Sequence, residues 1–453
     1  MTTTVDVVVV GMGPGGEEVA GTLAEAGLRV VGIDQRLVGG ECPYYGCVPS
    51  KMMIRAANLL AESRRVHGMA GECDVRPDWA PVARRIRDEA TDNWDDRVAV
   101  ERFEGKGGTF VRGSGRLVGP MRVAVDGDEF EATRAVVIAT GTEPAIPPIA
   151  GLEGTPFWTN REAVEAETVP ESLLVLGGGA IGVELGQVFA RFGARVDVVE
   201  AVDRLLPPEE PEAGALLAET FAGEGIGVHT AAKVASVEHD GDRFAIRIDG
   251  GGALEAERLL VATGRKVDLA ALGVDVMGVD ASARAIPVDE RLRVAPGVWA
   301  VGDVTGKGAF THVSMYQARI AVADILGLAP APADYKALPR VTFTDPEVGS
   351  VGLSRRGAEE QGLRVQTGFA RIPESARGWI HKAGNHGFIK LVADADRGVL
   401  VGATSAGPVG GEVLGLLTLA VHAEVPVEQL RRMIYAYPTF HRAVEDAVRD
   451  LLT

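Results

Sequence analysis

The fold is decided by the stretch Val5–Gly16, which reads VDVVVVGMGPGG. A run of β-branched residues leads into a G-x-G-x-x-G turn, and a helical pattern follows that ends near Gly27. This order predicts a buried strand, a tight turn and a helix. The stretch 28–33, which reads LRVVGI, predicts a second buried strand that closes on Asp34, so the segment has the length of one βαβ crossover.

The same pattern returns at Leu173–Gly182, which reads LLVLGGGAIG, and the strand predicted over 195–199 ends on Glu200. A turn of this kind brings backbone N–H groups and a helix N-terminus to a pyrophosphate, and the acid accepts a hydrogen bond from a ribose hydroxyl. Two dinucleotide sites are therefore predicted, and a glycine-rich turn without a ligand is the alternative for each. The predicted contacts are Gly11, Gly13, Gly16 and Asp34 in the first site, and Gly177, Gly179, Gly182 and Glu200 in the second.

A further repeated feature is a strand followed by Ala-Thr-Gly, which occurs over 136–141 and again over 259–264. The repetition indicates a duplicated domain plan. The predicted fold class is α/β, with two Rossmann-like dinucleotide-binding domains and a C-terminal α+β domain. The predicted boundaries are 1–150 for the first domain, 151–265 for the second, 266–335 for a return to the first, and 336–453 for the C-terminal domain.

The bulk composition excludes several classes of partner. The net charge of -17 at pH 7 disfavours a phosphate backbone, so nucleic acid is not expected to bind. No apolar stretch reaches membrane-spanning length and no basic leader precedes Val7, so no membrane partner is expected and a cytoplasmic location is predicted. Three cysteines make a poor disulfide framework for 453 residues, but Cys42 and Cys47 lie close together, which indicates redox chemistry. No metal site is predicted.

Both of these cysteines lie in Gly39–Lys51, which reads GGECPYYGCVPSK and follows the first crossover directly. With this motif the chain resembles the class I pyridine nucleotide–disulfide oxidoreductases, the family of glutathione reductase, dihydrolipoamide dehydrogenase and mercuric reductase. The family motif begins GGTC, and Glu41 stands here in place of its threonine. The resemblance implies FAD in the first domain, NAD(P)H in the second, and a homodimer formed through the C-terminal domain. Because Glu200 would repel a 2′-phosphate, NADH is expected to be preferred over NADPH, although the nearby Arg204 would have the opposite effect.

The resemblance also assigns roles to individual residues. Cys42 would exchange with the substrate, and Cys47 would face the flavin as a thiolate. Lys51 and Glu184 match the ion pair that the family places beside flavin N5, and Asp303 matches its ribityl-binding aspartate. Further expected cofactor contacts are Thr140, Gly141, Gly264, Arg265, Thr311 and His312, with a satisfied core histidine as the alternative for the last.

The chain departs from the family in its C-terminal stretch, which reads YPTFHR where the family has HPTxSE. Tyr437 takes the place of the histidine and Arg442 the place of the glutamate of an acid–base dyad. An imidazole titrates near about 6.5 and a phenol near about 10, so a tyrosine can donate a proton but is a poor base at neutral pH. If a helix begins near Pro438, His441 would lie one turn from Tyr437 and could replace the base; otherwise it is a solvated or packing residue.

The predicted function is that of an NAD(P)H oxidoreductase that passes electrons through FAD and the two motif cysteines to a small acceptor, namely a disulfide other than glutathione. Tyr44, Tyr45 and Tyr437 are candidates to line the acceptor channel, with core packing as the alternative for each. A second prediction is a quinone or other electron-acceptor reductase in which reduced flavin is the direct donor. A third is a dihydrolipoamide dehydrogenase-like subunit of a larger complex.

Overall fold

The structure is a computed structural model that describes residues 2–453, and contacts within it divide the chain into two units. Unit 1 consists of the N-terminal stretch through Ser50, Arg84–Ala145 and Arg265–Asp334. Unit 2 consists of Lys51–Ala83, Ile146–Gly264 and Tyr335–Thr453. This division follows contacts and does not test the four domain boundaries, which stay a prediction.

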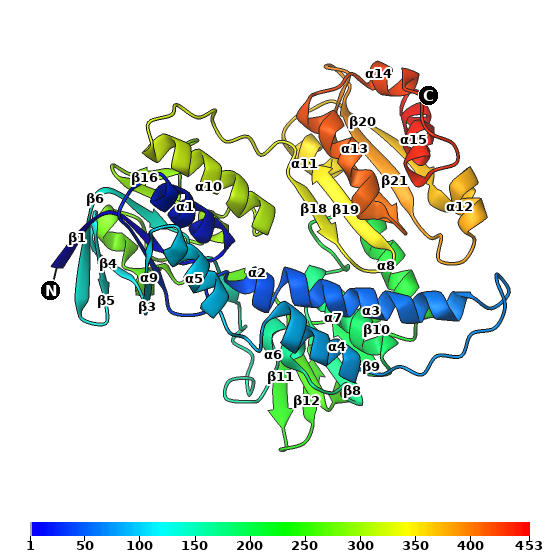
Figure 1. Cartoon of the computed structure of the whole chain (residues 1–453). Helices are drawn as coiled ribbons and strands as arrows, with labels where there is room; N and C mark the ends of the chain where they lie inside the picture. Colours follow the sequence, from blue (N-terminus) through cyan, green and yellow to red (C-terminus); the bar gives the residue numbers. More distant parts are fainter. Residues whose placement is uncertain (1) are drawn as a thin grey trace. The chain divides into compact units, whose positions relative to one another are not determined.

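The sheet of unit 1 is built around β1 (Thr2–Val10), which pairs in parallel with β2 (Val30–Asp34) and β6 (Asp128–Ile138). Its order is β16-β17-β6-β1-β2-β3, and an antiparallel hairpin of β4 and β5 extends from β6. Helices α1 (Pro14–Glu25) and α10 (Thr311–Ile325) lie side by side on one face of this sheet (Figure 1). Both faces are covered, which explains why β1 ends in four consecutive valines, Val7–Val10, and not in an alternating pattern.

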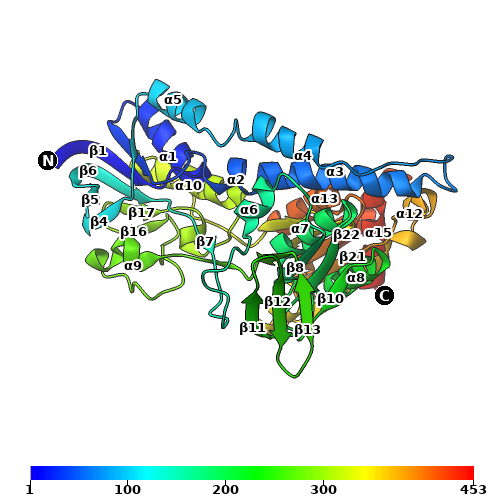
Figure 2. The same cartoon turned by 90° about the horizontal axis from the view of Figure 1, so that it is seen from below.

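The first sheet of unit 2 repeats this plan. Strands β10 (Gly227–His229), β9 (Arg195–Val199), β8 (Ser172–Leu176) and β14 (Arg258–Val261) are all parallel, in that order. The crossover from β8 to β9 runs through α7 (Ala180–Arg191). Figure 2 shows the small antiparallel sheet of β11 (Val234–His239), β12 (Phe244–Ile248) and β13 (Ala253–Ala256) that is inserted after β10.

The C-terminal part of unit 2 is a five-stranded antiparallel sheet in the order β18-β19-β22-β21-β20. Helices α13 (Gly410–His422) and α15 (Ala443–Leu451) pack on it (Figure 1). Leu417 and Val448 from these helices form one core with Ile389 and Leu391 of the sheet. The α+β prediction for this region and the two Rossmann-like predictions are therefore confirmed.

The remaining elements complete the chain. They are α2 (Glu41–Tyr44), α3 (Cys47–Arg65), α4 (Ala80–Arg85), the π-helix Ile86–Ala90, α5 (Arg97–Gly105), β3 (Thr109–Arg112), β4 (Arg116–Gly119), β5 (Arg122–Val125), β7 (Glu143–Pro144), α6 (Asn160–Glu165), α8 (Pro211–Gly223), β15 (Arg265–Lys266), α9 (Leu269–Leu272), β16 (Arg293–Ala295), β17 (Val298–Ala300), β18 (Pro339–Thr342), β19 (Glu347–Gly352), α11 (Arg355–Glu360), β20 (Val365–Arg371), α12 (Ala376–His381), β21 (Phe388–Asp394), β22 (Val399–Gly407) and α14 (Val427–Arg432), with short 3₁₀ turns at Val274–Met277, Asp303–Thr305, Ile372–Glu374 and Phe440–Arg442. Among residues 2–453, no helix has both the length and the apolar character needed to cross a bilayer.

Candidate active site

The first glycine-rich loop, in unit 1, is packed tightly at two of its glycines and open at the third. A Cβ on Gly11 would lie 2.4 Å from the carbonyl oxygen of Ala139, and a Cβ on Gly16 would lie 1.9 Å from that of Gly11. No atom lies within 4 Å of a Cβ built on Gly13, the residue that precedes α1. The loop therefore presents backbone N–H groups and a helix N-terminus to open space, which fits the pyrophosphate of FAD.

The acid at the end of β2 is already oriented by this loop. Asp34 accepts hydrogen bonds from the backbone N–H of Met12 at 2.7 Å and of Arg36 at 2.7 Å. Burial raises the pKa of Asp34, and these two donors oppose the shift. Its carboxylate oxygens keep lone pairs that could accept from ribose hydroxyls, and this role of Asp34 stays a prediction.

The second glycine-rich loop, in unit 2, has the same construction. A Cβ on Gly177 would lie 2.4 Å from the carbonyl oxygen of Ala262, and a Cβ on Gly182 would lie 2.0 Å from that of Gly177, but Gly179 has no atom within 4 Å. Glu200 accepts from the backbone N–H of Gly178 at 2.6 Å. Arg204, the nearby cation that would favour a 2′-phosphate, donates to the carbonyl oxygen of Pro207 at 2.8 Å.

The cysteine motif is attached to the first loop. The N–H of Gly39 donates to the carbonyl oxygen of Met12 at 2.7 Å, and a Cβ on Gly40 would lie 2.8 Å from the Cα of Gly13. Gly40 has a φ of 66°, which a residue with a side chain rarely adopts. The glycines at the start of the motif thus let it pass directly over the first glycine-rich loop. Beyond them, Cys42 is half-buried in α2 and Cys47 is exposed at the start of α3.

Cys47 lies against the beginning of α10. Its Sγ is 3.4 Å from the Oγ1 of Thr311, the first residue of that helix. A hydroxyl donor and a helix N-terminus both favour a thiolate over a thiol. His312, the next residue, is exposed and its ring stacks on Phe310 at 5.2 Å, so it is not the core histidine that was the alternative reading.

Asp303 is held by a side chain that the sequence reasoning missed. The hydroxyl of Thr142 donates to Asp303 at 2.8 Å, and Arg265 donates to the same hydroxyl at 2.7 Å. Burial raises the pKa of Asp303, which the bond from Thr142 opposes. Arg265 also lies 3.8 Å from Glu41, the residue that departs from the family motif. Thr142 follows Thr140 and Gly141 directly in the sequence, and its position next to these two predicted cofactor contacts could have indicated its role.

In unit 2, the structure brings Lys51 and Glu184 together. Their Nζ and Oε2 atoms are 2.9 Å apart, and the side chain of Glu184 is only 7% exposed. The other carboxylate oxygen accepts from the backbone N–H of Phe343 at 2.8 Å, and the Lys51 ammonium lies 4.6 Å from the centre of the Phe343 ring. Phe343 therefore belongs to this site, and no pattern around it suggested that role. The position of the ion pair beside a flavin stays a prediction.

No α-helix begins near Pro438, so the condition under which His441 could replace the missing base is not met. Thr439 has an extended backbone, a 3₁₀ turn follows over Phe440–Arg442, and α15 begins only at Ala443. His441 is therefore not one α-helical turn from Tyr437, and its Nε2 lies instead 3.5 Å from the Oγ1 of Thr439. The physical reason is that the extended Thr439 separates Pro438 from the first helical residue, so the proline does not occupy the first turn.

The structure also separates the three tyrosines by their exposure. Tyr44 is 6% exposed, and burial raises the pKa of Tyr44 to about 12, so it packs in the core of unit 1. Tyr45 is half-buried. Tyr437 is 69% exposed, and the guanidinium of Arg442 lies 5.4 Å from the centre of its ring.

Comparison with known proteins assigns the chain to a family. The family of pyridine nucleotide-disulphide oxidoreductases matches residues 5–318, and the dimerisation domain of the same family matches residues 338–448. The chain belongs to this family. Its members are NAD(P)H-dependent flavoproteins that carry FAD, and the match to the dimerisation domain supports a homodimer.

Several relatives span nearly the whole chain. A dihydrolipoyl dehydrogenase from Chlorobaculum tepidum is 34% identical and the match covers 99% of this chain and 97% of that protein. A mercuric reductase from Acidithiobacillus ferrooxidans is 33% identical, with 94% and 79% covered. Among solved structures, the HOCl-induced flavoprotein disulfide reductase RclA from Escherichia coli, in its Cu(II) complex, has a TM-score of 0.86 at 25% identity over 99% of both chains. LpdA from Mycobacterium tuberculosis has a TM-score of 0.86 at 27% identity, with 99% and 100% covered.

The open side of the second loop gives a prediction for NADH binding. Gly179→Ala is expected to raise the KM for NADH about 10- to 100-fold, because the methyl group would fill the space where the pyrophosphate approaches backbone donors, and bonds to charged groups contribute about 1.5–3 kcal/mol. Thermal stability should change little, since no atom lies within 4 Å of the new Cβ. Steady-state kinetics and a melting curve check both points. Gly223→Ala, which is equally uncrowded but lies at the end of α8, is the matched control and should leave the KM unchanged.

The contact between Cys47 and Thr311 gives a second prediction. Thr311→Val keeps the shape of the side chain but removes its hydroxyl donor, so the thiolate should form at higher pH. We expect the pH midpoint of the long-wavelength absorbance of the two-electron-reduced enzyme to rise by up to about one unit. One unit corresponds to about 1.4 kcal/mol, which is about the contribution of one hydrogen bond, and the exposure of Cys47 to solvent sets this as the upper limit. Thr311→Ser retains the hydroxyl and should behave like the wild type. An unchanged midpoint in the valine variant would show that this contact does not stabilise the thiolate.

Proposed function

We propose that the protein is an NADH-preferring FAD enzyme that reduces a small disulfide other than glutathione through Cys42 and Cys47. One observation carries the proposal: the cysteine motif begins on the first glycine-rich loop, with the Cys47 sulfur at the start of α10. Bound FAD would supply the route by which a hydride from NADH becomes an electron pair for the Cys42–Cys47 disulfide. The site-residue roles assigned above are part of this proposal.

The protein's own residues would then carry the electron pair to the acceptor. The Cys42 thiolate attacks one sulfur of the acceptor disulfide, forms a mixed disulfide and releases the first thiol. Cys47 attacks Cys42 in that mixed disulfide, which releases the second thiol and restores the intramolecular disulfide. Each turnover consumes one NADH and one proton and yields two thiols.

The altered C-terminal stretch is the reason for excluding glutathione and lipoamide as efficient substrates. The leaving thiolates need protons, and Tyr437 could donate one but would be a poor base in the reverse direction. Positioned acid–base catalysis contributes about 10²- to 10⁴-fold, so an ordinary dithiol exchange should be slower here by that order. A low-molecular-weight disulfide whose thiols leave readily as thiolates fits this site better.

The second candidate is a quinone or other electron-acceptor reductase in which reduced flavin is the direct donor. The replacement of the acid–base dyad by Tyr437 and Arg442 favours it, because such acceptors do not need thiol protonation. A subunit of a larger complex is the third candidate, and it is motivated by the dihydrolipoyl dehydrogenases among the relatives.

The experiment that tests the proposal is an anaerobic titration of the purified protein with NADH. A long-wavelength band of a flavin–thiolate pair at two electrons per flavin supports the disulfide route. Direct bleaching to reduced flavin without that band would overturn it and favour the flavin-level acceptors. A preparation that titrates normally but co-purifies with a large dehydrogenase assembly would support the subunit candidate.

A further inference from the structure

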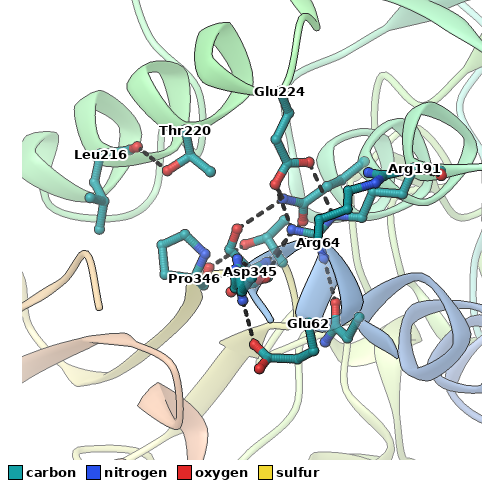
Figure 3. Close-up of polar contacts among 12 residues, drawn as sticks. Glu62, Arg64, Arg191, Leu216, Thr220, Glu224, Asp345 and Pro346 are labelled. Carbon is teal, nitrogen blue, oxygen red and sulfur yellow. Dashed lines mark hydrogen bonds and ion pairs between the residues drawn. The ribbon is translucent and has the colours of Figure 1, made fainter. Parts of the chain in front are cut away.

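Unit 2 also contains a buried arginine that is not part of the candidate active site. Arg191, the last residue of α7, is 2% exposed, and its guanidinium makes a bidentate pair with Glu224 at 3.0 and 2.5 Å (Figure 3). It also donates to the Oδ2 of Asp345 at 2.9 Å and to the Oδ1 of Asn58 at 2.7 Å. A buried charge is costly unless its hydrogen bonds are satisfied, so this site is held in one arrangement by several segments at once.

A second arginine reaches the same carboxylate from α3. Arg65 donates to the Oδ2 of Asp345 at 2.6 Å and to Glu62 at 2.6 Å. Figure 3 shows Asp345 lying among side chains from α3, α7 and the chain near Glu224. Asp345 is thus shared by two guanidinium groups, that of Arg65 from α3 and that of Arg191 from α7.

The helix faces that carry this cluster also carry the ion pair of the candidate active site. On α7, Glu184 lies seven residues before Arg191, and on α3, Lys51 lies seven residues before Asn58. Residues seven apart lie on the same side of a helix. The two helices are therefore joined at two levels, by Lys51–Glu184 at one and by Asn58–Arg191 two turns further along.

The segment that follows β18 is fastened to α7 at the same two levels. The N–H of Phe343 donates to Glu184, and two residues on, Asp345 exchanges a pair of 2.8 Å bonds with Gln187, from its N–H to Oε1 and from Nε2 to its carbonyl oxygen. This segment connects β18 to β19 in the sheet of the dimerisation domain. A continuous set of bonds therefore runs from that domain to the Lys51–Glu184 pair.

We propose that Arg191, Asp345 and Gln187 form a positioning clamp that sets the geometry of the Lys51–Glu184 pair and ties it to the dimerisation domain. The clamp acts by fixing three segments, namely α3, α7 and residues 343–345, and none of its members contacts the reacting atoms. The inference rests on the proposed function to the extent that Lys51 serves a flavin. Loosening the clamp should allow the ammonium to shift, and displacements of about 1 Å in a positioning group can cost on the order of 100-fold in rate.

The first test measures the clamp without any cofactor. Asp345→Asn removes the charge shared by Arg65 and Arg191 but keeps the size of the side chain and the backbone bonds to Gln187. In the FAD-free full chain, we expect the amides of residues 51–58 to exchange with deuterium about tenfold faster, while those of β21 stay unchanged. Asp396→Asn is the matched control, because Asp396 pairs with Arg364 at 2.7 Å on the surface. Equal exchange over 51–58 in both variants would overturn the clamp.

The second test asks whether the clamp acts through Lys51. In the FAD-loaded protein, Asp345→Asn is expected to slow the reduction of flavin by NADH about tenfold or more in stopped flow, but to have no further effect in a Lys51→Gln background. Equal slowing in both backgrounds would show general destabilisation and contradict the proposal. If Asp345→Asn does not fold, Glu224→Gln serves instead, since it loosens the clamp at Arg191 by removing the charge of the bidentate partner of that guanidinium. A wild type that binds no FAD would defeat the proposed function, while the exchange measurement would still decide on the clamp.

Discussion

Cys42→Ser is expected to abolish turnover of the acceptor while the bound flavin is still reduced by NADH. The substitution removes the sulfur that attacks the acceptor but leaves both glycine-rich loops and the Lys51–Glu184 pair intact. A serine hydroxyl is a far weaker nucleophile than a thiolate, so the loss in kcat should be at least about a thousandfold. Stopped-flow reduction by NADH and steady-state turnover of a low-molecular-weight disulfide measure the two half-reactions separately.

The third cysteine provides the control for this experiment. Cys73 is exposed and lies outside the redox motif, so Cys73→Ser should leave both half-reactions unchanged. If Cys42→Ser turns over its acceptor at the wild-type rate, the electrons leave from the flavin itself. The quinone or other electron-acceptor reductase would then replace the disulfide reductase as the function.

Restoring the family's acid–base dyad should raise the rate of disulfide exchange. Tyr437→His combined with Arg442→Glu is expected to raise kcat/KM for dithiol–disulfide exchange near neutral pH by about 10²- to 10⁴-fold, because an imidazole can both accept and donate a proton there. Tyr437 is exposed, so the change should cost little folding stability. The pH profile of kcat/KM with lipoamide checks this result, since a new ionisation near pH 6 to 7 should appear with the gain.

Two single variants separate the contributions. Tyr437→Phe removes only the hydroxyl and should lower the wild-type rate if that hydroxyl donates the proton. Arg442→Glu alone breaks the pair between Arg442 and Glu445, 3.1 Å apart, and should alter stability by no more than a few tenths of a kcal/mol. A double variant with no gain in any disulfide assay would show that proton transfer does not limit the rate at which the acceptor is reduced.

The valine run of β1 and the two G-x-G-x-x-G turns were sufficient to predict both crossovers, because the signal is local. A continuous apolar run requires a strand covered on both faces. The glycines are required because a Cβ on Gly16 would lie 1.9 Å from the carbonyl oxygen of Gly11 in the same loop. The acids after each second strand could be predicted for the same reason. Asp34 and Glu200 each accept from the backbone N–H that follows the first glycine of their loop.

Other features escaped the sequence because they depend on residues far apart in the chain. The Cys47–Thr311 contact joins positions 264 residues apart, and the bond between Arg191 and Asp345 joins positions 154 apart. An arginine near the end of an amphipathic helix reads as a solvated residue, and nothing in its neighbourhood indicates that it is buried. A proline favours the first turn of a helix, so the sequence left a helix start near Pro438 open, but the backbone of Thr439 is extended and α15 begins at Ala443.

The sequence by itself determined the fold class, the two dinucleotide-binding loops, the cysteine motif and the loss of the family's acid–base dyad. Each of these is written in residues that are close together, where steric limits and hydrogen-bond chemistry leave few alternatives. Only the tertiary structure decided which partners hold Cys47, Asp303 and Glu184, and that Arg191 is buried between two helices and the β18–β19 connection. Those facts follow from the packing of distant segments, because the cost of burying a charge is met only where all of its partners converge.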